Sequence, residues 1–161
     1  MRLTRIVPKR LLGGSAFASV GKRVFPRFDL ALQRVSRGRL SLTSAVGMPF
    51  LLLETTGRRT GQPRVTPLTY AARGADFLVI GSNWGQARQP AWVLNLCAKP
   101  DAVVSLRGRR IPVTARTLEG AERAEVWPLL LEVWPAYDDY VERVRATSGR
   151  EIMVFRLERS S

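Results

Sequence analysis

An arginine-rich stretch from Thr55 to Arg64 is the first part of the sequence whose residue types could do chemistry. Its glycines permit positive φ and a close approach of the backbone to a ligand. Its threonine hydroxyls and main-chain amides donate hydrogen bonds, and its arginines can hold a phosphate or carboxylate by paired donors. The stretch predicts an anion-binding loop, with a charged and merely solvated hairpin as the alternative. The residues that would bind are Arg58, Arg59, Thr60, Gly61 and Arg64.

A second candidate, from Ser82 to Trp92, runs off an expected strand into an expected helix. Pro90 is placed as an early helical residue, a position that proline favours. Main-chain amides at the start of a helix point at ligand oxygens, so this segment also suits an oxygen-rich ligand. Trp92 shares a face with Leu96, and packing in the core explains it as well as ligand contact does.

A third candidate is a pair of tyrosines, Tyr137 and Tyr140, in the stretch that begins at Trp134. Residues three apart on a helix project from the same side, so both phenols can meet one substrate. A phenol orients a substrate or donates a proton without the help of histidine. Taken alone, such a pair more often serves packing.

The residues that the chain lacks exclude several classes of site. The sequence contains no histidine, and Cys97 is its single cysteine. Hydrolysis by a Ser-His-Asp or Cys-His arrangement is excluded, no intramolecular disulfide can form, and the Cys/His clusters of zinc sites are missing. No Walker or Rossmann glycine pattern occurs. The longest apolar run, residues 48–53, is too short to span a membrane and no secretory signal is recognisable, so we expect a cytoplasmic protein.

The net charge of +13 is concentrated near the start of the sequence. Residues 1–39 hold ten Arg or Lys against Asp29 alone, a charge of +9, whereas the remaining residues hold 16 basic and 12 acidic side chains, a charge of +4. Between Phe17 and Val35 apolar residues recur every three or four positions, which predicts a helix that Pro26 kinks or splits. Such a basic arm suits the surface of an anionic membrane, and packing on the domain or on a partner subunit is an equal alternative.

The patterning of the rest predicts one α+β domain, mostly β, over residues 47–161, preceded by the basic arm and a linker over residues 1–46. Apolar alternation, turn residues and helical spacing predict the order β-β-β-α-β-β-α-α-β, with tight hairpin turns marked by Gly74 and Asp76 and by Arg107-Gly108-Arg109. This order has too few crossover helices for a doubly wound parallel sheet, so an antiparallel barrel is favoured. The expected strands are residues 48–55, 64–73, 75–82, 102–106, 110–118 and 151–158, and the expected helices are residues 89–98, 119–133 and 136–145.

In this order and spacing, the candidate segments resemble the deazaflavin-dependent nitroreductase family. Its members are split β-barrel proteins, similar to flavin reductases and pyridoxamine-phosphate oxidases, that use the reduced 8-hydroxy-5-deazaflavin coenzyme F-420. The resemblance covers about residues 48–157, and its motifs are specific as a set and weak singly. They are Thr56 to Arg64, Pro67-Leu68, Pro90-Ala91-Trp92 with Asn95-Leu96, and Trp134 to Tyr140.

The resemblance implies a coenzyme whose phosphate and oligoglutamate tail lies near the arginine loop. A hydride would pass to a flat acceptor such as a quinone or nitroaromatic, with Tyr137 and Tyr140 as the catalytic residues that hold the acceptor. Gln89 and Trp134 depart from the family pattern near the acceptor, since relatives often have histidine at the first position and some have tyrosine at the second. The ring would lie beside Pro67, Leu68, Ser82 and Asn83, and the implied coenzyme-binding set also includes Gly85, Pro90, Ala91, Trp92 and Asn95.

Other interpretations stay open at the level of sequence. A barrel of the same architecture that binds flavin mononucleotide (FMN) or haem also needs a phosphate or carboxylate clamp. A non-enzymatic protein could instead use the basic arm on a membrane or nucleic acid, although no recognised nucleic-acid-binding fold is present. Related split barrels often pair, so by analogy we expect a homodimer.

Overall fold

Residues 48–160, which this computed structural model describes, form seven strands, three α-helices and one 3-10 helix. The predicted order of elements and the antiparallel, mostly β architecture are confirmed, except that one expected strand divides in two. The helix predicted between Phe17 and Val35 lies outside the described residues. The elements are β1 Phe50–Thr56, β2 Pro63–Thr69, β3 Ala71–Arg73, β4 Asp76–Ile80, η2 Asn83–Gly85, α3 Ala91–Ala98, β5 Asp101–Leu106, β6 Arg109–Leu118, α4 Gly120–Val133, α5 Tyr137–Thr147 and β7 Val154–Arg159.

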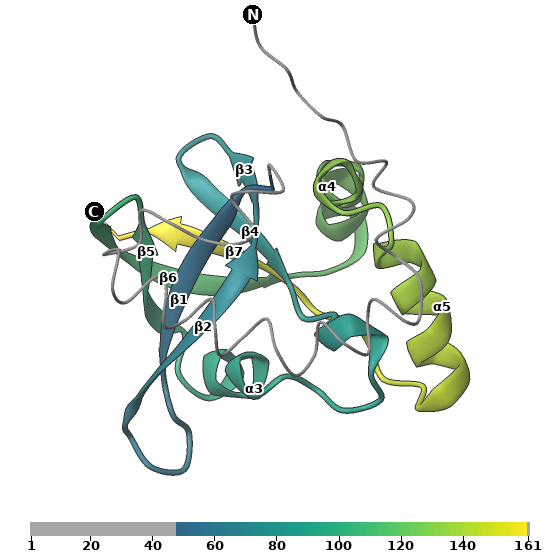
Figure 1. The fold of residues 1–161 in the computed structure, drawn as a ribbon, viewed down its shortest axis with the longest axis horizontal. Helices are drawn as coiled ribbons and strands as arrows, with labels where there is room; N and C mark the ends of the chain where they lie inside the picture. The colour runs from purple at the N-terminus through teal and green to yellow at the C-terminus, as the bar shows by residue number, and fades with distance from the viewer. Residues whose placement is uncertain (1–47, 161) are drawn as a thin grey trace, which may run out of the picture.

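The seven strands lie in one antiparallel sheet with the order β2-β1-β5-β6-β7-β4-β3. The edge strands β2 and β3 are separated in the chain by Tyr70 alone, so the sheet must curl until its two edges converge at this residue. Figure 1 shows the resulting half-closed barrel. The prediction of one strand over residues 64–73 is wrong, because β2 pairs with β1 whereas β3 pairs with β4. Between them the Tyr70 amide donates to Pro49 O at 3.3 Å.

Two tight turns define the hairpins that were predicted from glycine positions. Gly74, with φ +61°, lies in the turn between Arg73 and Asp76, the pair that closes the β3–β4 hairpin. Arg107 and Gly108 have φ of +50° and +78° and connect β5 to β6. Positive φ in the central residues matches the twist of antiparallel strands, so both predicted turns are confirmed.

The strand β4 is buried on both faces and separates two parts of the core. Phe77 and Val79 pack with the buried residues of α3, whereas Leu78 and Ile80 pack with those of α4 and α5. This division follows from the alternation of side chains along a strand. In Figure 1, α3 accordingly lies at a different side of the sheet from α4 and α5.

The helices begin and end close to their predicted bounds. Pro90 caps α3 from the preceding position and Ala91 is the first helical residue, which corrects the prediction that Pro90 lies within the helix. The helix α5 ends just before Gly149, whose φ is +65°. Within residues 48–160, no helix has both the length and the apolar character needed to cross a bilayer.

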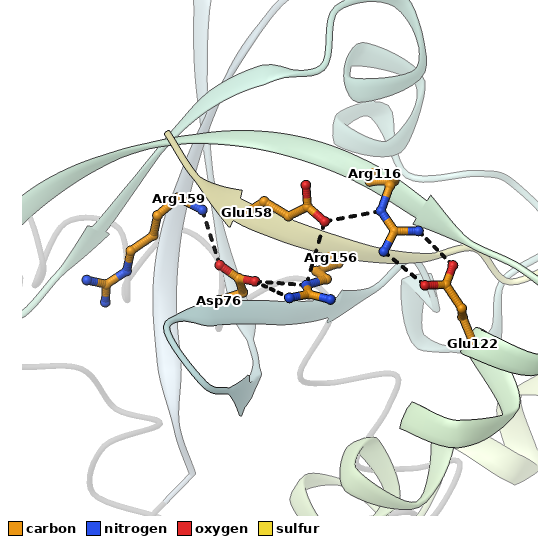
Figure 2. A network of polar contacts seen from close by, with 6 residues as sticks. All are labelled: Asp76, Arg116, Glu122, Arg156, Glu158 and Arg159. Atoms are coloured by element: carbon orange, nitrogen blue, oxygen red, sulfur yellow. Dashed lines mark hydrogen bonds and ion pairs between the residues drawn. The ribbon is translucent and has the colours of Figure 1, made fainter. Parts of the chain in front are cut away.

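A network of ion pairs joins β4, β6, β7 and α4 on the surface of the sheet, as Figure 2 shows. Arg156 donates to Asp76 Oδ2 through Nε at 2.8 Å and Nη2 at 2.6 Å. Arg116 donates to Glu122 at 2.7 and 3.1 Å and to Glu158 at 3.1 Å. Both arginines therefore have their charges opposed by the protein itself.

Candidate functional site

The loop between β1 and β2, residues 57–62, has a shape that requires a glycine. The Gly57 carbonyl accepts from the amides of Thr60 at 3.2 Å and Gly61 at 2.7 Å, and the Gly57 amide donates to Gln62 O at 2.8 Å. A Cβ at Gly57 would lie 2.9 Å from Thr60 Oγ1 and 3.0 Å from Gln62 O, closer than normal packing allows. Gly61 has φ +67°. The loop is therefore folded before any ligand binds.

A buried asparagine on α3 holds this loop from the core side. Asn95 is 5% exposed, its Oδ1 accepts from the Arg58 amide at 3.1 Å, and its Nδ2 donates to Thr55 Oγ1 at 3.0 Å. Because a buried amide must satisfy its donors and acceptors, these bonds fix both the helix and the loop. Asn95 was predicted to bind the coenzyme, and its position favours an indirect contribution. Thr55, the first residue of the predicted arginine-rich stretch, shares this role.

Arg58 and Arg59 of this loop, and Arg64 just after it in β2, have no anionic partner among the described residues. Arg58, Arg59 and Arg64 are exposed, and across residues 48–160 none of them forms an ion pair with a carboxylate. The preceding acidic residue, Glu54, is instead bonded by Arg110 at 3.0 and 3.2 Å. Three like charges within seven residues repel one another, so an anion at this loop would be stabilised. This geometry leaves the positive charge of the loop available to an anion.

The second candidate segment contains an unusual turn, η2. Asn83, Trp84 and Gly85 are three successive residues with positive φ, at 47°, 57° and 70°. Asparagine and glycine tolerate this region, whereas a non-glycine residue such as tryptophan pays about 1–3 kcal/mol and stays there only when its surroundings impose it. The Asn83 amide group donates to Arg88 O at 2.8 Å. Strain of this kind is typical of functional sites, which supports the choice of this segment.

The two predicted catalytic tyrosines lie side by side but are buried. Tyr137 and Tyr140 are 4% and 2% exposed, and their rings meet edge to face at 6.3 Å, as the three-residue spacing predicted. The Tyr137 hydroxyl shares a hydrogen bond of 2.8 Å with Thr69 Oγ1, and Tyr140 Oη accepts from Trp134 Nε1 at 3.3 Å. Burial raises the pKa of both phenols, that of Tyr137 to about 12, although these hydrogen bonds act in the opposite direction. Both stay protonated at neutral pH.

The remaining predicted residues divide between core and surface. Trp92 is 5% exposed and its ring lies 5.8 Å from that of Phe155, so packing in the core accounts for it. Pro67 and Leu68 are half-buried on the edge strand β2, where a missing amide donor is tolerated. Ala91 is exposed at the start of α3.

A series of contacts links the three candidate segments to one another and returns to the arginine loop. The arginine loop meets α3 through Asn95, and α3 meets the chain before η2 at Gly81, where a Cβ would lie 2.7 Å from a side chain of the helix. Gly85 of η2 lies against α5. Tyr137 of α5 bonds Thr69 of β2, and β2 leads back to the loop. The structure thus connects candidate segments that are far apart in the chain, such as Thr69 and Tyr137, which are 68 positions apart.

Known proteins resemble this chain in sequence and in fold. A family model described as F420H(2)-dependent quinone reductase matches residues 25–158. An F420H(2)-dependent quinone reductase of Mycobacterium tuberculosis is 38% identical over 108 residues, which cover 66% of this chain and 72% of that protein. A solved F420-H2 dependent reductase (FDR-A) matches with a TM-score of 0.60 and 33% identity over 68% of this chain and 94% of its own. A solved chain described as a domain-swapped dimer matches with a TM-score of 0.63 and 30% identity over 80% and 94%. This chain therefore belongs to the F420H(2)-dependent quinone reductase family.

Proposed function

We propose that this chain holds reduced coenzyme F-420 with its arginine loop and reduces a quinone-like acceptor beside the η2 turn. The reaction class, F-420-dependent reduction, is that of the family to which the chain belongs. The observation that carries the assignment is that, within residues 48–160, no carboxylate pairs with Arg58 or Arg59 of the loop whose shape Gly57 fixes, or with Arg64 just after it. A polyanionic coenzyme tail is complementary to that charge.

The protein's contribution is binding and orientation, and the bound coenzyme supplies the hydride. The guanidinium groups and the Thr60 hydroxyl would hold the tail. The half-buried Pro67 and Leu68 would offer an apolar surface to a flat ring, and Ser82 and Asn83 would offer polar groups to it. Because the chain has no histidine, the proton that completes quinone reduction would come from another acidic group or from water.

We assign Tyr137 and Tyr140 an indirect contribution to acceptor binding. Their burial favours this over the direct contact that the family resemblance implies. Tyr137 is bonded to Thr69, which directly follows the Pro67-Leu68 pair on β2. A phenol that stays protonated can hold the Thr69 hydroxyl in one orientation toward the acceptor.

Titration of the purified full chain with F-420, followed by the fluorescence of the coenzyme, tests this proposal. We expect one micromolar site and, with the reduced coenzyme, loss of its absorbance when a quinone is added. Absence of micromolar binding would overturn the proposal. A yellow protein with a flavin spectrum, produced in a host that lacks F-420, would favour the FMN alternative.

We also propose that the basic arm brings the enzyme to an anionic membrane, where lipid-soluble quinones are found. This rests on the charge of +9 and the apolar spacing in residues 1–39. Flotation with anionic vesicles should recover the full chain and not a variant that begins at Val46. Equal recovery of both would contradict the proposal.

We propose a homodimer as the assembly in solution. The support is a relative of 30% identity that is described as a domain-swapped dimer. Light scattering of the full chain should give twice the mass of 18.0 kDa, and a monomer at all concentrations would contradict it.

A further inference from the structure

Arg150 lies between α5 and β7 and was not among the residues predicted from the sequence. It forms hydrogen bonds with residues 81–89, the segment that contains η2 and leads to α3. Its guanidinium group is partly buried and donates to neutral oxygens, most of them main-chain carbonyls. Across the described part of the chain it forms no ion pair with a carboxylate. The acceptors are Gly81 O at 3.2 Å, Ser82 O at 2.8 Å, Gln86 O at 2.9 Å, Gln89 Oε1 at 3.1 Å and Glu151 O at 3.4 Å.

Two of these bonds span the η2 turn. Arg150 Nη2 bonds Ser82 O, immediately before the turn, and Nε bonds Gln86 O, immediately after it. The residues between them are those with positive φ, including Trp84. A rigid, planar guanidinium group can fix the separation of two carbonyl groups, which a lysine ammonium cannot do in the same way. Arg150 therefore supplies the external constraint that a strained turn needs.

Gln89 holds the guanidinium group in this position. Its Oε1 accepts from Arg150 Nη1, while its Nε2 donates to Glu151 O at 3.1 Å. Both polar atoms of the Gln89 side-chain amide are therefore hydrogen-bonded. The bond to the Glu151 carbonyl fixes the orientation of this amide beside Arg150. This gives a physical reason for Gln89, a residue that departs from the family pattern.

The opposite side of the turn is closed by α5. A Cβ at Gly85 would lie 3.1 Å from Tyr140 Cδ1 and 3.4 Å from Arg143 Cδ, so the backbone of the turn packs directly on the helix. The guanidinium carbon of Arg143 lies 5.7 Å from the centre of the Tyr140 ring. The turn is thus held between Arg150 and a buried tyrosine.

We infer that Arg150 is a positioning residue for hydride transfer, because it fixes the turn at residues 82–86 in the shape that aligns the acceptor with the coenzyme. This inference rests on the proposed function, in which Ser82 and Asn83 lie beside the reacting groups. It predicts that Arg150 acts on turnover, whereas the arginine loop acts on coenzyme affinity.

The test compares Arg150→Lys and Arg150→Ala with the control Arg145→Ala, an exposed arginine near the end of α5. The kcat per folded protein should fall roughly 10- to 100-fold in both Arg150 variants, since a small misplacement of reacting groups has effects of this size. The dissociation constant of F-420 should stay close to that of the control. Added guanidinium at non-denaturing concentration should restore part of the kcat of Arg150→Ala.

A normal kcat in both Arg150 variants, or a loss that only follows the loss of folded protein, would overturn the inference. If Arg150→Ala does not fold, Gln89→Leu takes its place, and unchanged turnover in Gln89→Leu and Arg150→Lys would overturn it equally. Wild-type protein that binds no F-420 would remove the proposed function and this inference together. Wild-type binding with unaffected Arg150 variants would remove the inference alone.

Discussion

Two groups of arginines on the same sheet differ in what opposes their charge. On β6 and β7, Arg116 and Arg156 bond carboxylates of their neighbours, as Figure 2 shows. On the β1–β2 loop and at the start of β2, Arg58, Arg59 and Arg64 have no such partner among residues 48–160. The first group connects parts of the fold. The charge of the second group is not neutralised by the described part of the protein and is available to a ligand.

The difference teaches that the basic character of this protein has separate origins. Arginine that is paired on the sheet adds nothing to the attraction of an anion, because the carboxylate already neutralises it. A loop that gathers unpaired guanidinium groups on a fixed backbone is arranged for recognition. Charge counts alone do not distinguish the two groups, and only their partners do.

Replacing Arg58 and Arg59 together by Ala should have the largest effect on coenzyme binding. Each lost charged hydrogen bond should cost about 1.5 kcal/mol, near the lower end of the usual range because the groups are exposed. Together this corresponds to roughly a 100-fold rise in the dissociation constant of F-420, measured by fluorescence titration. The control is Arg107→Ala with Arg109→Ala, which removes the same charge from the β5–β6 turn. Equal weakening by both pairs would mean that net charge, and not the loop, attracts the coenzyme.

Substitution of Gly57 by Ala should test whether the loop must be folded in advance. We expect a loss of about 1–3 kcal/mol in the free energy of unfolding, because the new methyl group meets Thr60 and the Gln62 carbonyl. Gly61→Ala is the matched control, since its φ is +67° but nothing lies within 4 Å of the added atom. Its cost should be about 1 kcal/mol. Urea unfolding and coenzyme titration of both variants give the comparison, and a Gly57→Ala variant as stable as Gly61→Ala would refute the packing argument.

Asp76→Asn should have the smallest effect on function, because it alters only the ion pairs of the sheet arginines and leaves the arginine loop unchanged. Burial acts to raise the pKa of Asp76, but hydrogen bonds from Arg156 and the Arg159 amide and the nearby positive charges outweigh it, so the pKa lies below its usual 3.8. A carboxyl group whose pKa is lower in the folded than in the unfolded protein stabilises the fold at pH values above its unfolded pKa. This stabilisation is lost as the pH falls through the folded pKa. The variant should therefore melt at a lower temperature than wild type near neutral pH and at the same temperature in strong acid. Coenzyme affinity should not change, and a melting difference that persists at all pH values would contradict this account.

Features encoded by neighbouring residues were predictable from the sequence. Gly74 and the Arg107-Gly108 pair were placed in turns because positive φ favours glycine there. The division at Tyr70 was not, since the apolar pattern on both sides is continuous and no local signal tells which edge of a sheet a strand will occupy.

The sequence predicted which segments form the candidate site, but not the residues that hold these segments in place. The arginine loop is contiguous in sequence, so its composition reveals it. Asn95 and Arg58 are 37 positions apart, and Arg150 and Ser82 are 68 apart, so their bonds depend on the completed fold. The assignment of the tyrosines had the same weakness, because helical spacing indicates that they share a side but not whether that side faces a ligand or the core.

The single residue between β2 and β3 also sets the circumference of the barrel. Since the chain passes from one edge of the sheet to the other at Tyr70, it leaves no slack by which the barrel could widen. One inserted residue there would reverse the alternation of side chains in whichever strand moved, and would turn Leu68 and Thr69 away from their present neighbours. A change of length in the exposed β5–β6 turn would affect one hairpin, whereas at Tyr70 the length is fixed by closure of the whole sheet.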